Sequence, residues 1–77
     1  MASRDRLHRR FGEALREVRK KKGLTQEALA HKAGITMAYV GQLERGLKSP
    51  SLWTIHRLCR ILGVSMRELV GAAEKLL

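Results

Sequence analysis

The chain has 77 residues and contains 16 Lys and Arg against 7 Asp and Glu, which gives it a formal net charge of +9. This length allows a single domain whose hydrophobic core stabilises it by only a few kcal/mol, and the 44% of hydrophobic residues exclude an intrinsically disordered chain. The excess positive charge favours a polyanionic partner, with nucleic acid first and an acidic membrane surface or acidic protein second.

The composition predicts an all-α fold, because Leu, Ala, Arg, Glu and Lys recur at helical spacing. Glycines follow the periodic stretches, where a left-handed helix end is favoured, and each is followed by a possible N-cap. The glycines are Gly23, Gly34, Gly46 and Gly63, and the N-caps are Thr25, Thr36, Ser51 and Ser65. Glu68 completes a capping box with Ser65. The five predicted helices span residues 5–22, 26–33, 37–45, 52–62 and 66–76.

Three of these helices have an apolar face that indicates the core. In helix 5–22 the face consists of Leu7, Phe11, Ala14, Leu15 and Val18. In helix 52–62 it consists of Leu52, Ile55, Leu58, Cys59 and Leu62. Helix 66–76 has a broader stripe than the last helix of a small monomer needs, formed by Met66, Leu69, Val70, Ala73, Leu76 and Leu77. Segment 64–77 is therefore the predicted dimerisation segment.

Residues 26–45 read QEALAHKAGITMAYVGQLER and have the spacing of a helix-turn-helix motif. Ala30 is small where the second helix crosses closely, and Gly34 supplies the turn conformation. The positions where the two helices face each other are apolar, namely Leu29, Ala33, Ile35, Val40 and Leu43. These seven positions together predict a helix-turn-helix at the centre of one domain that spans residues 1–77.

The sequence resembles the Cro and phage-repressor family of helix-turn-helix proteins, also called the xenobiotic response element family. The resemblance extends from about Phe11 to Val70 and depends on ALREVRKKKGLTQEALAHKAG, YVGQLERG, the loop KSPSL and RILGVSMREL. It implies a five-helix domain that binds operator DNA as a two-fold dimer, with helix 37–45 in the major groove. It also implies that Glu44 pairs with Arg19. Small members of the family, including controller proteins of restriction-modification systems, look closest in length.

The outer face of helix 37–45 is the candidate reading surface. With its apolar residues toward the core, 100° per residue places Ala38, Gln42 and Arg45 on the opposite side, with Gly41 beside them. Gln bonds adenine at N6 and N7, and Met or Ala contacts a thymine methyl group. The predicted base readers are therefore Gln42, Met37 and Ala38. Several phage repressors have polar residues at the last two positions, so we expect this chain to depend more on methyl contacts, DNA shape or Arg45.

Phosphate contacts are expected at the N-termini of the two motif helices, where free amides and the helix dipole favour anions. Gln26 and Thr36 lie at these ends. Tyr39, Arg45 and Lys48 add side-chain donors, which fix the register without reading sequence. The resemblance implies a further role for Gln26, because it matches a family position that links the DNA backbone to the outermost base pair.

Two basic clusters leave alternatives open. Residues 19–22 form either a nucleic-acid patch or, as we favour, a solvated helix end whose cations complement the helix dipole. The basic start is either an arm along the DNA or a fraying terminus, and its members are Arg4, Arg6, Arg9 and Arg10. Residues 1–22 contain nine basic and three acidic residues, a net +6. We therefore expect charge to set affinity, and the nearly uncharged face of helix 37–45 to set specificity.

Trp53 and Ile61 lie off the apolar stripe of helix 52–62, at positions where a monomer usually has polar residues. Trp is enriched at interface hot spots. The predicted dimer interface consists of Trp53, Ile61, Leu69, Val70, Ala73 and Leu76, of which Leu69 is the first candidate for the core instead. A symmetric dimer separates its two recognition helices by about 34 Å, one turn of DNA, and so predicts a palindromic operator.

The alternative function is a protein-interaction module, such as an antitoxin or a coactivator-like adaptor, in which helix 66–76 and Trp53 hold a different protein. An enzyme is disfavoured, because the chain lacks G-x-S-x-G, G-x-x-x-x-G-K-[ST], G-x-G-x-x-G and H-E-x-x-H. His8, His31 and His56 are too scattered for a metal site. We expect no metal, no cofactor and no small-molecule ligand.

The location is expected to be cytoplasmic, with no membrane partner. Cys59 is the only cysteine and cannot form an internal disulfide, so it is most simply a small buried residue. The N-terminal MASRDRLHRR has no apolar stretch typical of a signal peptide. No apolar run approaches the roughly 18 to 20 residues that cross a bilayer.

Overall fold

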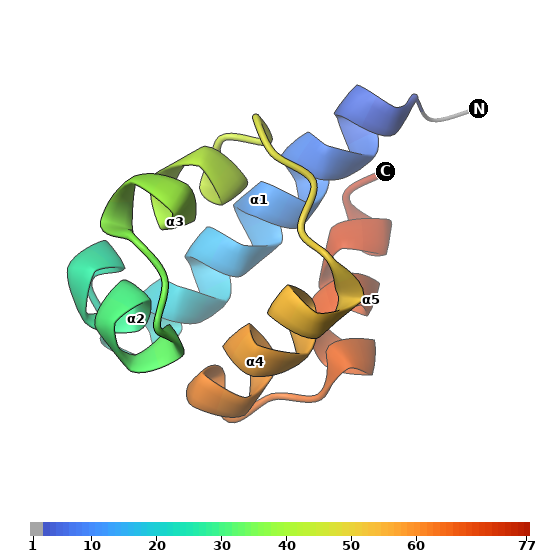
Figure 1. Ribbon diagram of the computed structural model, residues 1–77. Coiled ribbons are helices and arrows are strands. Elements are labelled where there is room, and N and C mark those ends of the chain that lie inside the picture. The colour runs from blue at the N-terminus through green and yellow to red at the C-terminus, as the bar shows by residue number, and fades with distance from the viewer. Residues whose placement is uncertain (1–2) are drawn as a thin grey trace.

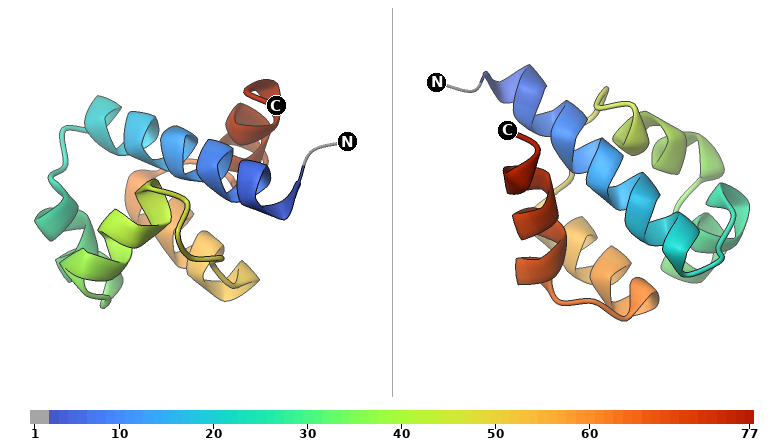
Figure 2. Two further views of the ribbon diagram at one scale, coloured as in Figure 1. Left: turned by 90° about the horizontal axis from the view of Figure 1, so that it is seen from above. Right: turned by 180° about the vertical axis from the view of Figure 1, so that it is seen from behind.

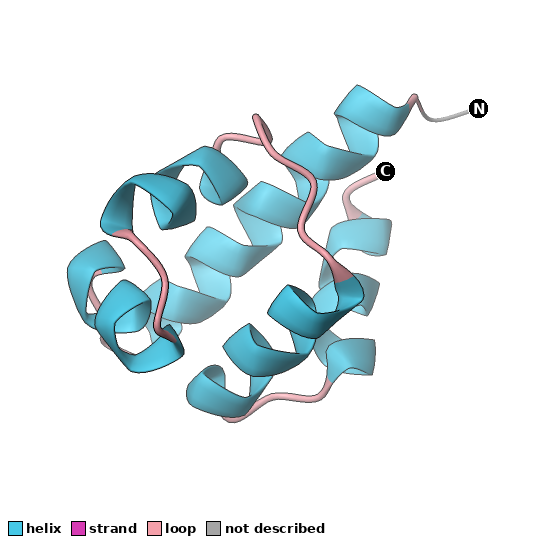
Figure 3. Cartoon of the chain, viewed as in Figure 1, coloured by secondary structure: helices cyan, strands magenta, loops and turns pink. Residues whose placement is uncertain are grey.

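The computed structural model describes residues 3–77. The expectation of no signal peptide concerns the N-terminal segment, whose first two residues lie outside this range. The chain forms five α-helices (Figure 1, Figure 3): α1 (Arg4–Lys21), α2 (Gln26–Ala33), α3 (Met37–Glu44), α4 (Leu52–Leu62) and α5 (Met66–Lys75). The predicted all-α, five-helix fold is therefore confirmed, and every helix end lies within one residue of its predicted position. No helix within residues 3–77 is long and apolar enough to cross a membrane.

Side-chain caps explain why the helices begin where they do. Each predicted N-cap hydroxyl accepts a hydrogen bond from a backbone N–H three residues later, as Thr36 does from Tyr39 at 3.0 Å. Ser3 caps α1 in the same way through Arg6. The predicted capping box of α5 is present, since Glu68 also accepts a hydrogen bond from the backbone N–H of Ser65.

α1 is the central helix of the fold. It packs against α5 on one side and α3 on the other, while α2 contacts α3 and α4, and α4 contacts α5. Figure 1 and Figure 2 show α2 and α3 side by side at one end of the molecule and α4 and α5 at the other. The first turn of α1 lies close to the C-terminal residue, since the guanidinium of Arg6 donates to the backbone carbonyl of Leu77.

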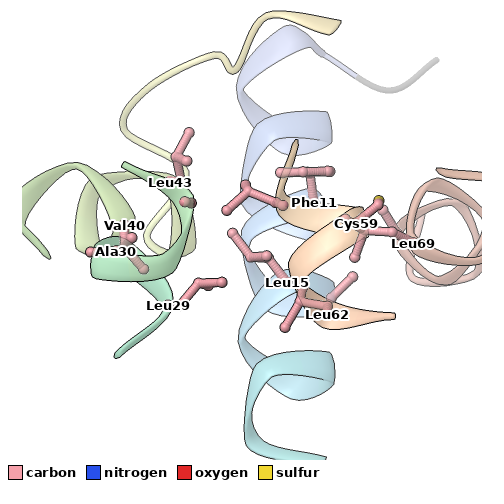
Figure 4. Close-up of a cluster of buried hydrophobic side chains, with 13 residues drawn as sticks. Phe11, Leu15, Leu29, Ala30, Val40, Leu43, Cys59, Leu62 and Leu69 are labelled. Atoms are coloured by element: carbon pink, nitrogen blue, oxygen red, sulfur yellow. The ribbon is translucent and has the colours of Figure 1, made fainter. Parts of the chain in front are cut away.

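The hydrophobic core contains side chains from all five helices. Figure 4 shows side chains of the other helices converging on Phe11 and Leu15 of α1. The fully buried leucines and valine are Leu15, Leu29, Val40, Leu43, Leu58, Leu62 and Leu69. Each contributes about 1.5–3 kcal/mol relative to an exposed side chain, so this cluster holds α2 and α3 in place against α1.

The structure corrects three residues of the sequence analysis, Leu7, Leu52 and Ala73, and confirms Leu69 as the interface candidate that belongs to the core instead. Leu7 is 45% exposed and Leu52 is 72% exposed, so neither belongs to the core. Both lie in the first turn of their helix, before it reaches the elements that bury its apolar stripe. Conversely, Leu69 and Ala73 are buried in the core, because this face of α5 packs against the rest of the chain. Ala73 is therefore wrong as a dimer-interface residue.

The close approach of α1 to α3 depends on Gly12. A Cβ atom built on Gly12 would overlap the backbone carbonyl oxygens of Leu43 and Glu44 at the end of α3. If the overlapping atoms belonged to a flexible side chain, that side chain could rotate away. They are backbone atoms in the last turn of a packed helix, so they cannot move aside in this way. The absence of a side chain at Gly12 therefore sets the distance between α1 and α3.

We expect Gly12→Ala to lower the free energy of unfolding by about 1–3 kcal/mol, because the added methyl group forces α1 away from α3. Gly71→Ala is the matched control, since Gly71 lies inside α5 and a Cβ there meets open space. The control should raise the free energy by about 0.5–1 kcal/mol through its higher helix propensity. Urea unfolding followed by circular dichroism measures both. Equal effects of the same sign would contradict the role assigned to Gly12.

Candidate nucleic-acid interface

The turn between α2 and α3 has one defined conformation. Gly34 ends α2 with φ 69° and ψ 31°, in the left-handed region that glycine adopts without strain. The N–H of Ile35 then donates to the carbonyl of Ala30 at 3.0 Å, and the Ile35 side chain packs against the core. These contacts fix the direction in which α3 leaves the turn.

α3 buries one face and leaves the other free. Val40 and Leu43 are fully buried, whereas Met37 is 54% exposed and Ala38 is exposed. Gln42 is half-buried, and Arg45, directly after α3, is exposed. Of the predicted base readers, Met37 and Ala38 are therefore exposed at the start of α3, and Gln42 is partly exposed one turn later.

The N-terminus of α3 retains donors for an anion. Thr36 uses its hydroxyl oxygen to cap the helix, so its own O–H remains available to donate. The first backbone N–H groups of any helix have no intrahelical acceptor, and here they follow Thr36 at the exposed end of α3. Thr25 caps α2 in the same way. Both helix ends therefore have the properties of a phosphate-binding position.

The family resemblance implies a pair between Arg19 and Glu44, and the two residues form a bidentate ion pair in the structure. Nε of Arg19 lies 2.6 Å from one carboxylate oxygen of Glu44, and Nη2 lies 3.1 Å from the other. Only 8% of the Arg19 side chain and 3% of the Glu44 side chain are exposed. Nη1 of Arg19 also donates to the carbonyl of Leu24 at 2.8 Å. The pair thus joins α1, the end of α3 and the segment before α2.

Gln26 is bonded to this pair, which sequence reasoning missed. Its Nε2 donates to a carboxylate oxygen of Glu44 at 3.0 Å. An ionised carboxylate only accepts hydrogen bonds, so the amide nitrogen of Gln26 must face Glu44. The carbonyl oxygen and the second N–H remain for a ligand. No sequence signal connects the two residues, because 18 positions separate them on different helices.

The Gln26 amide and the Arg45 guanidinium meet over Gly41. A Cβ on Gly41 would lie 3.4 Å from Nη1 of Arg45 and 3.9 Å from Oε1 of Gln26. Two residues predicted to contact phosphate are therefore adjacent on one surface, although they come from α2 and from the end of α3.

The remaining predicted contact residues are placed differently. Lys48 is exposed in the loop between α3 and α4, where its ammonium group is free to reach a phosphate. Tyr39 is half-buried and packs against the core, so its ring supports α3 and only its hydroxyl is a candidate donor.

The predicted interface residues do not form one surface. Ile61 is half-buried and packs against the core. Trp53 is 66% exposed, with its ring centroid 5.8 Å from that of His56. Val70 is exposed on α5, and Leu76 is exposed directly after it. Val70 also lines an apolar groove of about 200 Å³ that is lined on the α1 side by Leu7, His8 and Phe11.

The described part of the chain contains potential metal-ligating side chains and one thiol. Residues 3–77 contain no group of three or more His, Cys, Asp or Glu side chains arranged to hold a metal ion. The one thiol, Cys59, is buried, and burial together with the nearby charge of Glu68 raises its pKa above the usual value. A thiol of this kind is an inert core residue and not a nucleophile.

Comparison with known proteins gives four consistent matches. The helix-turn-helix family model HTH_3 matches residues 15–69. An uncharacterised HTH-type transcriptional regulator of Sinorhizobium fredii, y4dJ, is 38% identical over 69 residues, 90% of each chain. The crystal structure of the restriction-modification controller protein C.AhdI from Aeromonas hydrophila is 46% identical with a TM-score of 0.77, over 79% of this chain and 92% of that one. The structure of the regulator SinR in complex with DNA is 33% identical with a TM-score of 0.74, over 78% and 97%.

The fold and the exposed face of α3 define a DNA-binding transcriptional regulator. The chain belongs to the HTH_3 helix-turn-helix family, the Cro and phage-repressor type that the sequence resembles. The predicted resemblance and the predicted class of function are both confirmed.

Proposed function

We propose that this protein is a cytoplasmic regulator that binds a palindromic operator as a homodimer, with α3 of each protomer in the major groove. The observation that carries the proposal is the division of α3 into a buried inner face and an outer face that residues 3–77 leave uncovered. The solved complex of SinR with DNA, a structural neighbour of this chain, supports DNA as the ligand.

Base readout in this proposal comes from three residues on the outer face of α3. Gln42 bonds an adenine through its amide, and Met37 and Ala38 contact thymine methyl groups. Since only Gln42 among these makes side-chain hydrogen bonds, one base pair in each half-site is specified strongly. The others are specified by weaker apolar contacts and by DNA shape.

Phosphate contacts fix how the motif lies on the duplex. Thr36 and the first amides of α3 bind one phosphate, and Gln26 and Arg45 bind another across Gly41. Lys48 and the hydroxyl of Tyr39 add donors from the same side of the motif. The geometry of Gln26 is set in advance by Glu44, so binding requires little reorganisation of this side chain.

The dimer in this proposal forms through α5. Leu69 and Ala73 are the residues of α5 that are buried in the core, whereas Val70 and Leu76 remain exposed and are available to a partner. Leu7 of α1 borders the same groove as Val70 and extends the apolar surface. A two-fold axis near this surface places the two copies of α3 about 34 Å apart, one turn of DNA.

Selection of bound DNA from a random pool tests the proposal, and the expected product is a palindrome with half-sites one turn apart. On that DNA, Gln42→Ala should weaken binding by about 1–3 kcal/mol and relax one base position in each half-site. Binding to unrelated DNA serves as the control and should not change. A pool that yields no preferred sequence, or a variant with unaltered preference, would refute the proposed readout.

Val70→Asp should convert the dimer into a folded monomer and weaken operator binding at least 100-fold, because each half-site is then bound independently. Sedimentation equilibrium and circular dichroism measure association and folding. Trp53→Ala is the comparison variant, since Trp53 is also an exposed apolar side chain but lies on α4. The α5 interface is excluded if Val70→Asp remains dimeric, and it is replaced by an α4 interface if only Trp53→Ala dissociates.

A further inference from the structure

The basic start of the chain is an ordered part of α1. Ser3 caps the helix at Arg4, so each arginine in this segment has a defined direction. Arg6 donates to the carbonyl of Leu77, and Arg10 forms an ion pair with Glu13 at 2.8 Å. Within residues 3–77, Arg9 has no carboxylate within 4.0 Å. Arg9 therefore keeps an uncompensated charge on a rigid helix.

Arg9 lies against the loop that follows α3. Gly46 has φ +73°, and a Cβ atom on it would come within 2.7 Å of both Cα and Cγ of Arg9. The stem of Arg9 thus crosses directly over Gly46 with no side chain between them. Its guanidinium extends beyond Cγ from this crossing. A side chain from the second turn of α1 is in this way brought to the end of the recognition helix, 37 positions away in the sequence.

The neighbours of Gly46 in the chain are cationic. Arg45 precedes it and Lys48 follows two residues later, and both are exposed. Arg9 is also exposed. Three cationic residues from α1 and from the end of α3 thus flank one chain reversal, with the Arg45 guanidinium over Gly41. No acidic side chain forms an ion pair with any of them in the described residues.

We propose that Arg9 binds a DNA phosphate that flanks each half-site, so that α1 is part of the DNA-binding surface. The inference rests on the proposed function and extends it to a residue outside the helix-turn-helix motif. A guanidinium on a phosphate adds affinity and fixes register, but reads no base. The ordered helix decides between the two alternatives for the basic start: Arg9 meets the DNA from a rigid position, neither as a mobile arm nor as a frayed end.

Salt dependence distinguishes this role from a general effect of charge. Each phosphate contact contributes about −0.9 to the slope of log K against log salt, so a dimer that loses both Arg9 contacts should have a slope less negative by about 2. At 0.1 M salt the loss corresponds to about tenfold in affinity per protomer. The selected half-site sequence should stay the same.

The test compares Arg9→Gln with Arg60→Gln on the selected operator. Arg60 is exposed on α4, so its variant has the same net charge without touching the surface around Gly46. Affinity is measured over a salt series, and urea unfolding is measured for both variants. We expect the slope to change for Arg9→Gln alone, with the free energy of unfolding unchanged in both.

Neutral methylphosphonate groups placed singly along the operator locate the contact. One flanking substitution in each half-site should weaken the wild-type protein and leave Arg9→Gln unaffected. The inference is overturned if the two variants have the same salt slope, or if Arg9→Gln changes only stability, as a cation that merely complements the end of α3 would. Absence of sequence-specific binding by the wild-type protein would instead refute the proposed function.

Discussion

The buried ion pair between Arg19 and Glu44 is the interaction on which the DNA-binding surface depends. It joins α1 to the last turn of α3, and the same groups bond the Leu24 carbonyl and the Gln26 amide. Loss of one partner leaves a buried charge uncompensated at a cost of about 3–5 kcal/mol. That cost is comparable to the whole stability expected of a domain of this length. The position of α3 and the stability of the fold therefore depend on one set of contacts.

The network also connects the core to the ligand surface. The ion pair joins α1 and α3, the two helices whose close contact Gly12 permits, and the Gln26 amide beside Arg45 is bonded to it. Specificity and affinity then come from different places. In the proposed mode of binding, the nearly uncharged outer face of α3 reads bases, whereas the cations around Gly46 and along α1 attract the phosphates.

The fold was predictable because it is specified locally. A capping side chain such as Thr36 precedes every helix, a glycine such as Gly34 follows each of the first four, and the family resemblance covers most of the chain. Local patterns fail where burial depends on distant segments. Leu7 and Leu52 match an apolar stripe but lie beyond the elements that would cover them. The contacts of Gln26 with Glu44 and of Arg9 with Gly46 cross between helices, so no spacing in the sequence indicates them.

DNA binding by Arg19→Met/Glu44→Leu tests the central claim most directly. Each single substitution leaves one buried charge without a partner and so lowers the free energy of unfolding. Because the double variant removes both charges together, it should avoid most of this loss and fold. If the pair orients Gln26, the folded double variant should bind the selected operator as weakly as Gln26→Leu, and adding Gln26→Leu should cause no further loss. A folded double variant that binds with wild-type affinity, or one in which the two effects add in full, would contradict the account.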